Sequence, residues 1–193
     1  VTKKDVYPLP RADDLIQATE GARFFTALDV TWGYWNIPMR ESDIEKTAFI
    51  THEGLYEFQR MEFGLTNAPA TFQRLMDGVT HGINWVYTLV YLDDIIVFSR
   101  TFEDHLVHLR EVFTRLRKAN LKLKAKKCAW CHAETEYLGH VLTNDGQIKR
   151  DPKKLAVIRD FPVPKSLAHL RRFLGMTGYY RHFIPRYAHI SGP

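Results

Sequence analysis

The chain has 193 residues, of which 45% are hydrophobic and 25% charged, which excludes disordered and fibrous classes and leaves room for one ordinary or two small domains. Its two cysteines exclude a disulfide scaffold and favour a reducing compartment. No apolar run approaches the roughly 18–20 residues that a membrane span requires. Because the sequence starts at Val1 with neither an initiator methionine nor a signal peptide, we expect a segment of a longer polypeptide.

Basic residues are concentrated at the C-terminal end. Residues 1–148 contain 17 Lys and Arg against 20 Asp and Glu, whereas residues 149–193 contain 10 against 2. Such a basic region predicts a module that binds a polyanion such as nucleic acid. The alternative is a solvated basic surface, which is the commoner fate of such runs.

The first part of the chain is predicted to alternate strands and helices. In order, the pattern predicts an extended lead-in at 7–10, a helix at 11–20, a buried strand at 23–30, strands at 48–50 and 56–60, a helix at 67–81, apolar strands at 86–91 and 95–99, and a helix beginning at Thr101. A capping box, Thr101 to Asp104, marks the start of that last helix. Its predicted apolar face consists of Leu106, Leu109, Val112, Phe113 and Leu116.

The remaining elements lead into a basic helical region. A half-buried strand is predicted at 121–126, strands at 137–143 and 147–149 around the turn Asn144-Asp145-Gly146, and helices at 151–161 and 166–182. The predicted order is therefore an α+β body followed by a mostly helical basic module, with the boundary near residue 149.

Three carboxylates occur where apolar strands would not otherwise tolerate them. Asp29 interrupts the predicted strand rich in Phe and Leu, and Asp93 and Asp94 separate two apolar strands. Grouped at strand ends, these side chains would repel one another unless a divalent cation neutralised them. Oxygen ligands favour magnesium or manganese over zinc, and two such ions would support phosphoryl transfer. The alternative is that Asp93 and Asp94 form an ordinary turn.

Five motifs follow one another along the chain. They are Leu28-Asp29-Val30 with Gly33-Tyr34, the segment 63–72, Tyr91-Leu92-Asp93-Asp94, the segment 137–140, and the segments 170–175 and 179–184. In this order they resemble motifs of the reverse transcriptases of gypsy-type (Metaviridae) long-terminal-repeat retrotransposon pol polyproteins. Glu62 and Trp35-Asn36 depart from the family's usual Pro and His-Gln, and we expect these departures to tune the chemistry without abolishing it.

The resemblance implies an α+β right-hand polymerase fold. A palm with an antiparallel sheet, helices on one face and a partial fingers region would occupy residues 1–148, and a small helical thumb residues 149–193. The implied function is that of an RNA-directed DNA polymerase that extends a primer by two-metal nucleotidyl transfer. A different two-metal nucleotidyl transferase on a related palm is a less favoured reading, because the 63–72 motif and the thumb both resemble retroelements.

The resemblance also implies a role for individual acidic and basic residues. Asp29 and Asp93 would be the main ligands of two magnesium ions, for which manganese can substitute, and Asp94 the third member of the triad. Lys127, or Lys126 as an alternate, would protonate pyrophosphate. A surface lysine on an alternating strand is an equally good reading of Lys127.

Further positions are implied to hold the nucleotide and the nucleic acid. Tyr34 would exclude the ribose 2′-hydroxyl, with a packed palm aromatic as the alternative, and Phe63 and Gly64 would line the nucleotide pocket. The implied primer grip is Tyr137, Leu138, Gly139 and His140. The implied contacts to the template–primer backbone are Arg171, Arg172 and Arg181, which the sequence places on the last helix.

Several expectations about partners follow from the same resemblance. They are an RNA template, RNA/DNA or DNA/DNA duplexes, deoxynucleoside triphosphates, no membrane, ribonuclease H and integrase regions elsewhere in the polyprotein, and a location in the cytoplasm or within virus-like particles. Family members carry a basic fingertip hairpin upstream of the point where this sequence begins. The alternative function is therefore a catalytically weak or inactive nucleic-acid-binding fragment, truncated or adopted by its host. Cys128 and Cys131 are too few for a zinc site and are expected to be ordinary thiols.

Overall fold

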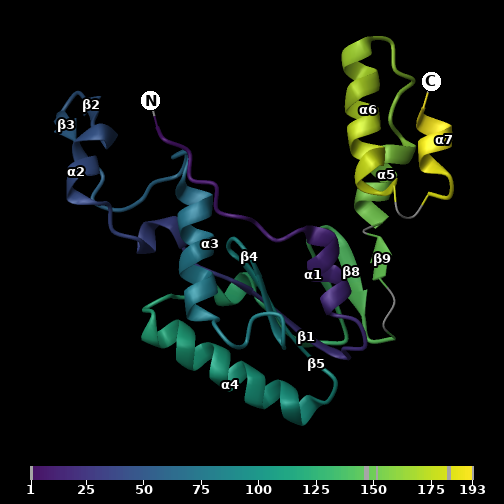
Figure 1. Ribbon diagram of the computed structural model, residues 1–193, viewed down its shortest axis with the longest axis horizontal. Helices are drawn as coiled ribbons and strands as arrows, with labels where there is room; N and C mark the ends of the chain where they lie inside the picture. Colours follow the sequence, from purple (N-terminus) through teal and green to yellow (C-terminus); the bar gives the residue numbers. More distant parts are fainter. Residues whose placement is uncertain (1, 146–147, 151, 182–183, 193) are drawn as a thin grey trace. The chain divides into compact units, whose positions relative to one another are not determined.

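The computed structural model describes residues 2–145, 148–150, 152–181 and 184–192. The chain divides into two compact units, Val1–Lys149 and Arg150–Pro193 (Figure 1), and each is described by itself. The assignment of residues 1–148 as a palm and 149–193 as a thumb stays a prediction. Among the described residues, no helix combines the length and the apolar character that crossing a membrane would require.

A four-stranded antiparallel sheet forms the centre of the first unit. Its strand order is β4 (Thr88–Tyr91), β5 (Asp94–Ser99), β1 (Phe24–Asp29) and β6 (Ala129–His132). Adjacent residues of β5 enter different hydrophobic clusters, with Ile95 on one side and Ile96 on the other, because side chains alternate along a strand. The strands predicted at 23–30, 86–91 and 95–99 are confirmed, whereas β6 was not predicted.

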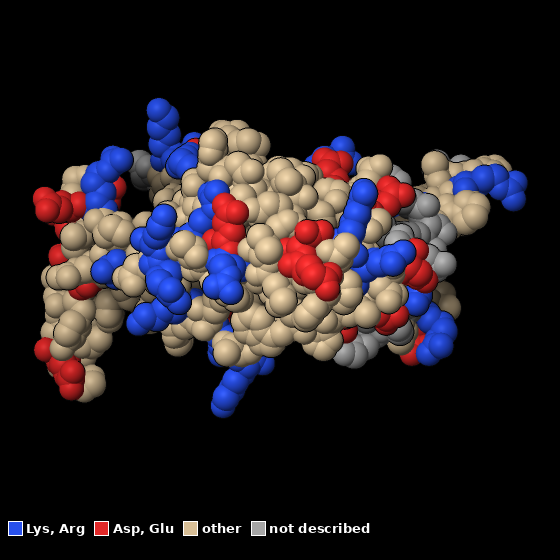
Figure 2. Space-filling model, turned by 90° about the horizontal axis from the view of Figure 1, so that it is seen from below, with Lys and Arg blue, Asp and Glu red and all other residues tan. Residues whose placement is uncertain are grey.

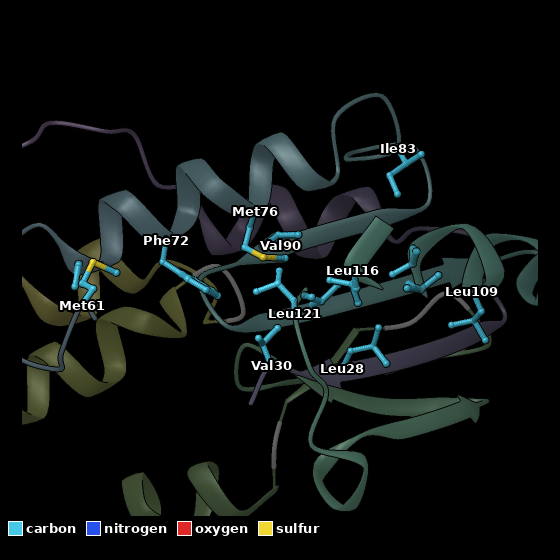
Figure 3. Close-up of a cluster of buried hydrophobic side chains, with 14 residues drawn as sticks. Leu28, Val30, Met61, Phe72, Met76, Ile83, Val90, Leu109, Leu116 and Leu121 are labelled. Carbon is cyan, nitrogen blue, oxygen red and sulfur yellow. The ribbon is translucent and has the colours of Figure 1, made fainter. Parts of the chain in front are cut away.

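Two long helices cover one face of this sheet. They are α3 (Ala68–Val79) and α4 (Phe102–Lys118), which agree with the helices predicted at 67–81 and from Thr101. Phe72 and Met76 of α3 and Leu109 of α4 pack with Leu28 and Val90 of the sheet in one buried cluster (Figure 3). Burial of these apolar side chains is the main stabilising contribution to this layer.

The opposite face is covered by different elements. Leu15 and Ile16 of α1 (Ala12–Ala18) share a buried cluster with Leu142, which belongs to the hairpin of β7 (Glu134–Tyr137) and β8 (His140–Thr143). A short strand, β9 (Ile148–Arg150), extends this second sheet. The single strand predicted at 137–143 is therefore wrong, because Leu138 and Gly139 adopt left-handed backbone conformations that reverse the chain.

Two other strand predictions are wrong. A small hairpin consists of β2 (Phe49–Thr51) and β3 (Gly54–Tyr56), so its second strand is not at 56–60. Residues 121–126 form no strand, although their alternating pattern suggests one. Leu123 makes only an isolated bridge to Val30, after which the chain turns into the short 3-10 helix η3 (Ala125–Lys127).

Short helices connect β1 to this hairpin. They are η1 (Gly33–Asn36), α2 (Glu41–Ile44) and η2 (Glu45–Thr47).

Figure 2, which looks at the molecule from below the view of Figure 1, shows acidic and basic side chains interspersed on that face.

The second unit consists of short helices. They are α5 (Pro152–Arg159), α6 (Leu167–Tyr179) and α7 (Tyr187–Ser191), of which α7 was not predicted. The Ser166 side chain caps α6 by accepting a hydrogen bond from the His169 N–H. The hydroxyls of Tyr187 and Thr177 lie 2.9 Å apart and link α7 to α6. Four predictions fall partly outside the described residues: the turn at 144–146, the strand start at 147, the helix start at 151 and the helix end at 182.

A buried polar network joins α4 to the central sheet. The Thr101 hydroxyl caps α4 by accepting from the Asp104 N–H, as the capping box predicts. One turn in, the prediction that Leu106 is buried is wrong, because it is 50% exposed while His105 is fully buried. The His105 ring nitrogens lie 2.8 Å from Thr26 Oγ1 and 2.9 Å from Ser99 Oγ. Those two hydroxyls satisfy the polar ring, so the helix can bury a histidine in place of a leucine.

The buried His105 makes stability depend on pH. Burial, and then the charge of His108, lower the pKa of His105 to about 4. The unfolded chain, with an ordinary histidine pKa of about 6.5, therefore binds a proton that the native state does not bind between these values. The contribution of His105 to the free energy of unfolding is fully present above about pH 6.5 and is lost as the pH falls towards 4. We expect this group to lower the free energy of unfolding by about 2–3 kcal/mol from about pH 7.5 to about pH 4.5.

Urea unfolding of wild type and His105→Gln at the two pH values tests this prediction. The variant should be less stable at the higher pH, because it loses part of the network, but its stability should fall less on acidification. His52→Gln is the matched control, since that side chain is 91% exposed. An equal decrease in the free energy of unfolding on acidification in wild type and in His105→Gln would contradict the prediction.

Candidate active site at the ends of β1 and β5

The pairing of β1 with β5 places two carboxylates opposite each other. Asp29, the last residue of β1, is the register partner of Asp94, the first residue of β5. Directly opposed residues of antiparallel strands have Cβ atoms about 5 Å apart. Asp93 precedes Asp94 in the exposed turn after β4, where Leu92 has a left-handed backbone with φ of 55°. The structure thus brings the three predicted carboxylates to one end of the sheet.

A buried glutamine on α3 supports that turn. The Gln73 side chain is 1% exposed; its Oε1 accepts from the Leu92 N–H at 2.8 Å, and its Nε2 donates to the Val90 carbonyl at 3.2 Å. The same amide group donates to Asp77 Oδ1, and Asp77 Oδ2 accepts from the Tyr7 hydroxyl at 2.6 Å. Sequence reasoning missed Gln73, although a glutamine between the buried Phe72 and Met76 was a usable signal.

Charge interactions connect the carboxylates to one lysine. Burial, and then the charges of Asp93 and Asp29, raise the pKa of Asp94, whereas Lys127 lowers it. Lys127 Nζ donates to Asp29 Oδ2 at 3.0 Å, and this hydrogen bond with Asp29 raises the pKa of the Lys127 ammonium. Within the described part of the chain, the alternate candidate Lys126 makes no ion pair.

The three carboxylates have the right chemistry for a hard divalent cation. They supply oxygen ligands only, and their mutual repulsion, seen in the raised pKa of Asp94, is what a bound cation would relieve. However, across residues 2–145 and the other described segments, no three His, Cys, Asp or Glu side chains are grouped closely enough to hold an ion as they stand. The donor set fits magnesium, and Asp29 is neutralised by Lys127 in this arrangement.

The predicted primer grip lies beside the same carboxylates. A cavity of about 160 Å³ is lined by Ala27, Leu28, Asp29, Asp94, Ile95, Lys127, Glu136, Tyr137 and Leu138. Tyr137 and His140 close the β7–β8 hairpin as register partners, with Leu138 and Gly139 in its turn. Glu136 was missed, because nothing in its alternating strand distinguishes it from a surface residue.

The buried hydroxyl of Tyr137 is unsatisfied. The residue is 4% exposed, and its hydroxyl has no hydrogen-bond partner within the described residues. Burial, and then the charges of Asp94 and Tyr91, raise its pKa, so the hydroxyl stays protonated. A buried donor without an acceptor, close to a carboxylate, is a group that a ligand or water would satisfy.

The predicted nucleotide-pocket residues form an aromatic cluster. The Tyr34 ring lies 5.1 Å from the Phe63 ring and 5.6 Å from the Phe72 ring, measured between centroids. Burial and the charge of Asp93 raise the pKa of Tyr34, so its hydroxyl lies within electrostatic range of the carboxylates. Phe63 is 59% exposed, and Gly64 has φ of 95°, a conformation that disfavours other residues.

The three predicted backbone-binding arginines belong to the second unit. Arg171 and Arg172 are exposed on α6. Arg181 is exposed too, but it lies beyond the end of α6 at Tyr179, so its placement on the same helix is wrong. Their role stays a prediction.

The two cysteines, Cys128 and Cys131, lie at the edge of the hydrophobic core. Both are free and partly buried, and both pack against the main hydrophobic cluster. The Cys128 thiol donates to the Lys124 carbonyl at 3.4 Å.

Comparison with known proteins identifies the family. Residues 1–142 match the family described as reverse transcriptase (RNA-dependent DNA polymerase). All 193 residues align with the retrovirus-related Pol polyproteins from the Drosophila melanogaster transposons 297 and opus, at 46% and 47% identity. The Pol polyprotein from transposon gypsy of the same organism is 39% identical over 192 residues. The chain spans 18–19% of the length of these relatives.

Solved structures have the same fold. A foamy viral protease-reverse transcriptase in complex with double-stranded DNA aligns with a TM-score of 0.88 and 24% identity, over 98% of this chain and 33% of that one. A second such complex aligns with a TM-score of 0.82 and 25% identity, over 95% of this chain and 38% of that one. The α+β polymerase fold predicted from the sequence is therefore confirmed, and the chain belongs to the reverse transcriptase family.

Proposed function

We propose that this chain is the catalytic core of an RNA-directed DNA polymerase, which extends a primer on an RNA or DNA template. The observation that carries the proposal is the register of β1 and β5. It sets Asp29 against Asp94 beside the Asp93 turn, and the cavity at this end of the sheet is also lined by Lys127 and Tyr137. The proposal assigns Lys127 as a proton donor and the β7–β8 hairpin to the primer, and both lie beside the carboxylates.

Asp29, Asp93 and Asp94 would hold two magnesium ions, or manganese in their place. When bound, such ions lower the pKa of the primer 3′-hydroxyl and neutralise charge on the attacking and leaving oxygens. The hydroxyl oxygen loses its proton to solvent and forms a bond to the α-phosphorus as the bond from that phosphorus to pyrophosphate breaks. The ammonium of Lys127, held protonated by its raised pKa, would deliver a proton to the departing pyrophosphate.

The surrounding residues would select and position the substrates. The Tyr34 ring, packed between Phe63 and Phe72, would exclude a ribose 2′-hydroxyl by steric contact, and Gly64 would allow close approach of the nucleotide. The hairpin at Tyr137–His140 would hold the primer end. Exposed arginines of the second unit would contact duplex phosphates without reading sequence. The foamy viral structures, solved with double-stranded DNA, support duplex binding as part of the proposal.

A second candidate function is nucleic-acid binding without catalysis. It is favoured by the Lys127–Asp29 ion pair and by the finding that, in the described segments, no three candidate ligands are grouped to receive an ion. Under this proposal the chain would bind a template–primer through its basic second unit but extend it poorly. Primer extension and duplex binding, measured side by side, separate the two functions.

Primer extension on an RNA template with magnesium, and then manganese, tests the catalytic proposal. We expect metal-dependent extension by wild type and a loss of about 100-fold or more in Asp93→Asn, because a ligand charge is removed while the side-chain shape is kept. Duplex affinity should be unchanged in the variant. Binding without extension in wild type would support the second candidate, and extension that survives Asp93→Asn would contradict the assigned site.

The ion pair of Lys127 predicts an effect on metal affinity. Replacing Lys127 by Met removes a cation that competes for Asp29, so manganese should bind about 3- to 10-fold more tightly, a modest gain because the lysine is exposed. The spin resonance signal of free manganese measures binding without any need for activity. Lys126→Met, its neighbour on η3, is the matched control and should change affinity little. Weaker manganese binding by Lys127→Met would show that the lysine positions Asp29 for the ion.

A further inference from the structure

Two stacked tryptophans are exposed just after the strand that carries Asp29. The Trp32 and Trp35 rings lie 5.1 Å apart with an interplanar angle of 22°. Trp32 is 62% exposed and Trp35 is 46% exposed. Large apolar rings left in water as a pair are an unusual surface feature, and such features commonly mark a binding surface.

The turn that carries these rings is held by specific contacts. Trp32 has a left-handed backbone with φ of 53°, which is uncommon for a bulky residue. The Asn36 amide donates to the carbonyls of Thr31, Trp32 and Gly33, and Arg60 donates to the Asn36 carbonyl at 3.1 Å. A Cβ atom on Gly33 would come within 3.0 Å of the Phe72 ring. The rings are therefore presented by a preorganised turn.

Two exposed lysines belong to the segment whose backbone pairs with the start of this turn. The Thr31 N–H donates to the Lys122 carbonyl at 2.7 Å, and the Lys124 N–H donates to the Asp29 carbonyl at 2.9 Å. Both lysines are exposed, whereas Leu123 between them packs against the core. Aromatic faces with adjacent Lys and Arg side chains suit a chain of stacked rings joined by phosphates, which is the chemistry of a single-stranded nucleic acid.

We propose that Trp32 and Trp35 form a stacking platform for unpaired bases of a single-stranded nucleic acid, with Lys122 and Lys124 beside its phosphates. This inference deepens the proposed polymerase function. It rests on that function for identifying the bound strand as the template. The platform would hold unpaired bases by their π-faces, without sequence preference, since every base has such a face. A duplex with blunt ends offers no unpaired base and should not depend on the platform.

Fluorescence anisotropy of a labelled single-stranded oligonucleotide of about 12 residues, added to the intact chain, tests the platform. Trp32→Ala and Trp35→Ala should each bind about 5-fold or more weakly, whereas Trp32→Phe, which keeps a ring, should retain most of the affinity. Trp85→Ala is the matched control, because Trp85 is also exposed (47%) and also has a left-handed backbone, with φ of 66°. It should bind as wild type does.

An abasic oligonucleotide of the same length separates stacking from attraction to phosphates. Wild type should bind it more weakly than the base-containing strand, and no more tightly than Trp32→Ala binds it. Equal binding of both strands by wild type would overturn the proposal, as would unchanged binding by both alanine variants. A pair that instead joined two copies of the chain would show as a change in sedimentation of Trp32→Ala with oligonucleotide affinity intact, which also overturns it.

A further measurement keeps the result independent of folding and of catalysis. The oligonucleotide should lower tryptophan fluorescence by the same absolute intensity in wild type and in a Trp85→Phe Trp130→Phe variant, because the quenched rings remain. Loss of quenching in that variant would contradict the platform. None of these readouts requires synthesis, so a chain that failed in primer extension would refute the polymerase and leave the platform to be judged on binding alone.

Discussion

The register between β1 and β5 is the constraint on which the candidate site depends. Phe25 pairs with Phe98 and Leu28 with Ile95, and the same ladder ends with Asp29 opposite Asp94. Because side chains alternate, a shift of one residue would turn the apolar residues of one strand to the wrong face and separate the two carboxylates. The clusters on both faces of the sheet oppose such a shift. The hydrophobic core therefore sets the placement of the acidic groups at its edge.

Support for the acidic turn comes from outside the sheet. Gln73 links α3 to the Leu92 backbone, and Asp77 links Gln73 to Tyr7 in the extended N-terminal segment. Arg74 adds an ion pair with Asp5 at 2.6 Å. A polar side chain on the buried face of a helix is tolerated when each of its hydrogen-bonding groups has a partner. Here those contacts couple the position of the carboxylate turn to a helix and to a segment more than 60 residues away in sequence.

Much of the central fold could be predicted from the sequence, because its signals are local. The apolar runs beside the Asp residues specify their strands, Pro69 fits the first turn of α3, and the Thr101 side chain caps α4, all through nearby residues. The failures have a tertiary origin. Residues 121–126 alternate like a strand, yet only isolated backbone contacts form, and the chain then turns to bring Lys127 to Asp29. The carboxylates were visible in the sequence, whereas Gln73 depends on a partner 19 residues away.

The Ser99 hydroxyl has one proton and two histidine neighbours, since its oxygen lies 2.9 Å from His105 Nδ1 and 2.8 Å from His108 Nδ1. If Ser99 donates to His108, then His105 must carry its proton on Nδ1; if Ser99 donates to His105, then His108 must carry its proton on Nδ1. The tautomers of the two rings are therefore coupled. The tautomer of the half-buried His108 therefore sets the direction of hydrogen bonding inside the core as far as Thr26, which lies 2.8 Å from the other ring nitrogen of His105.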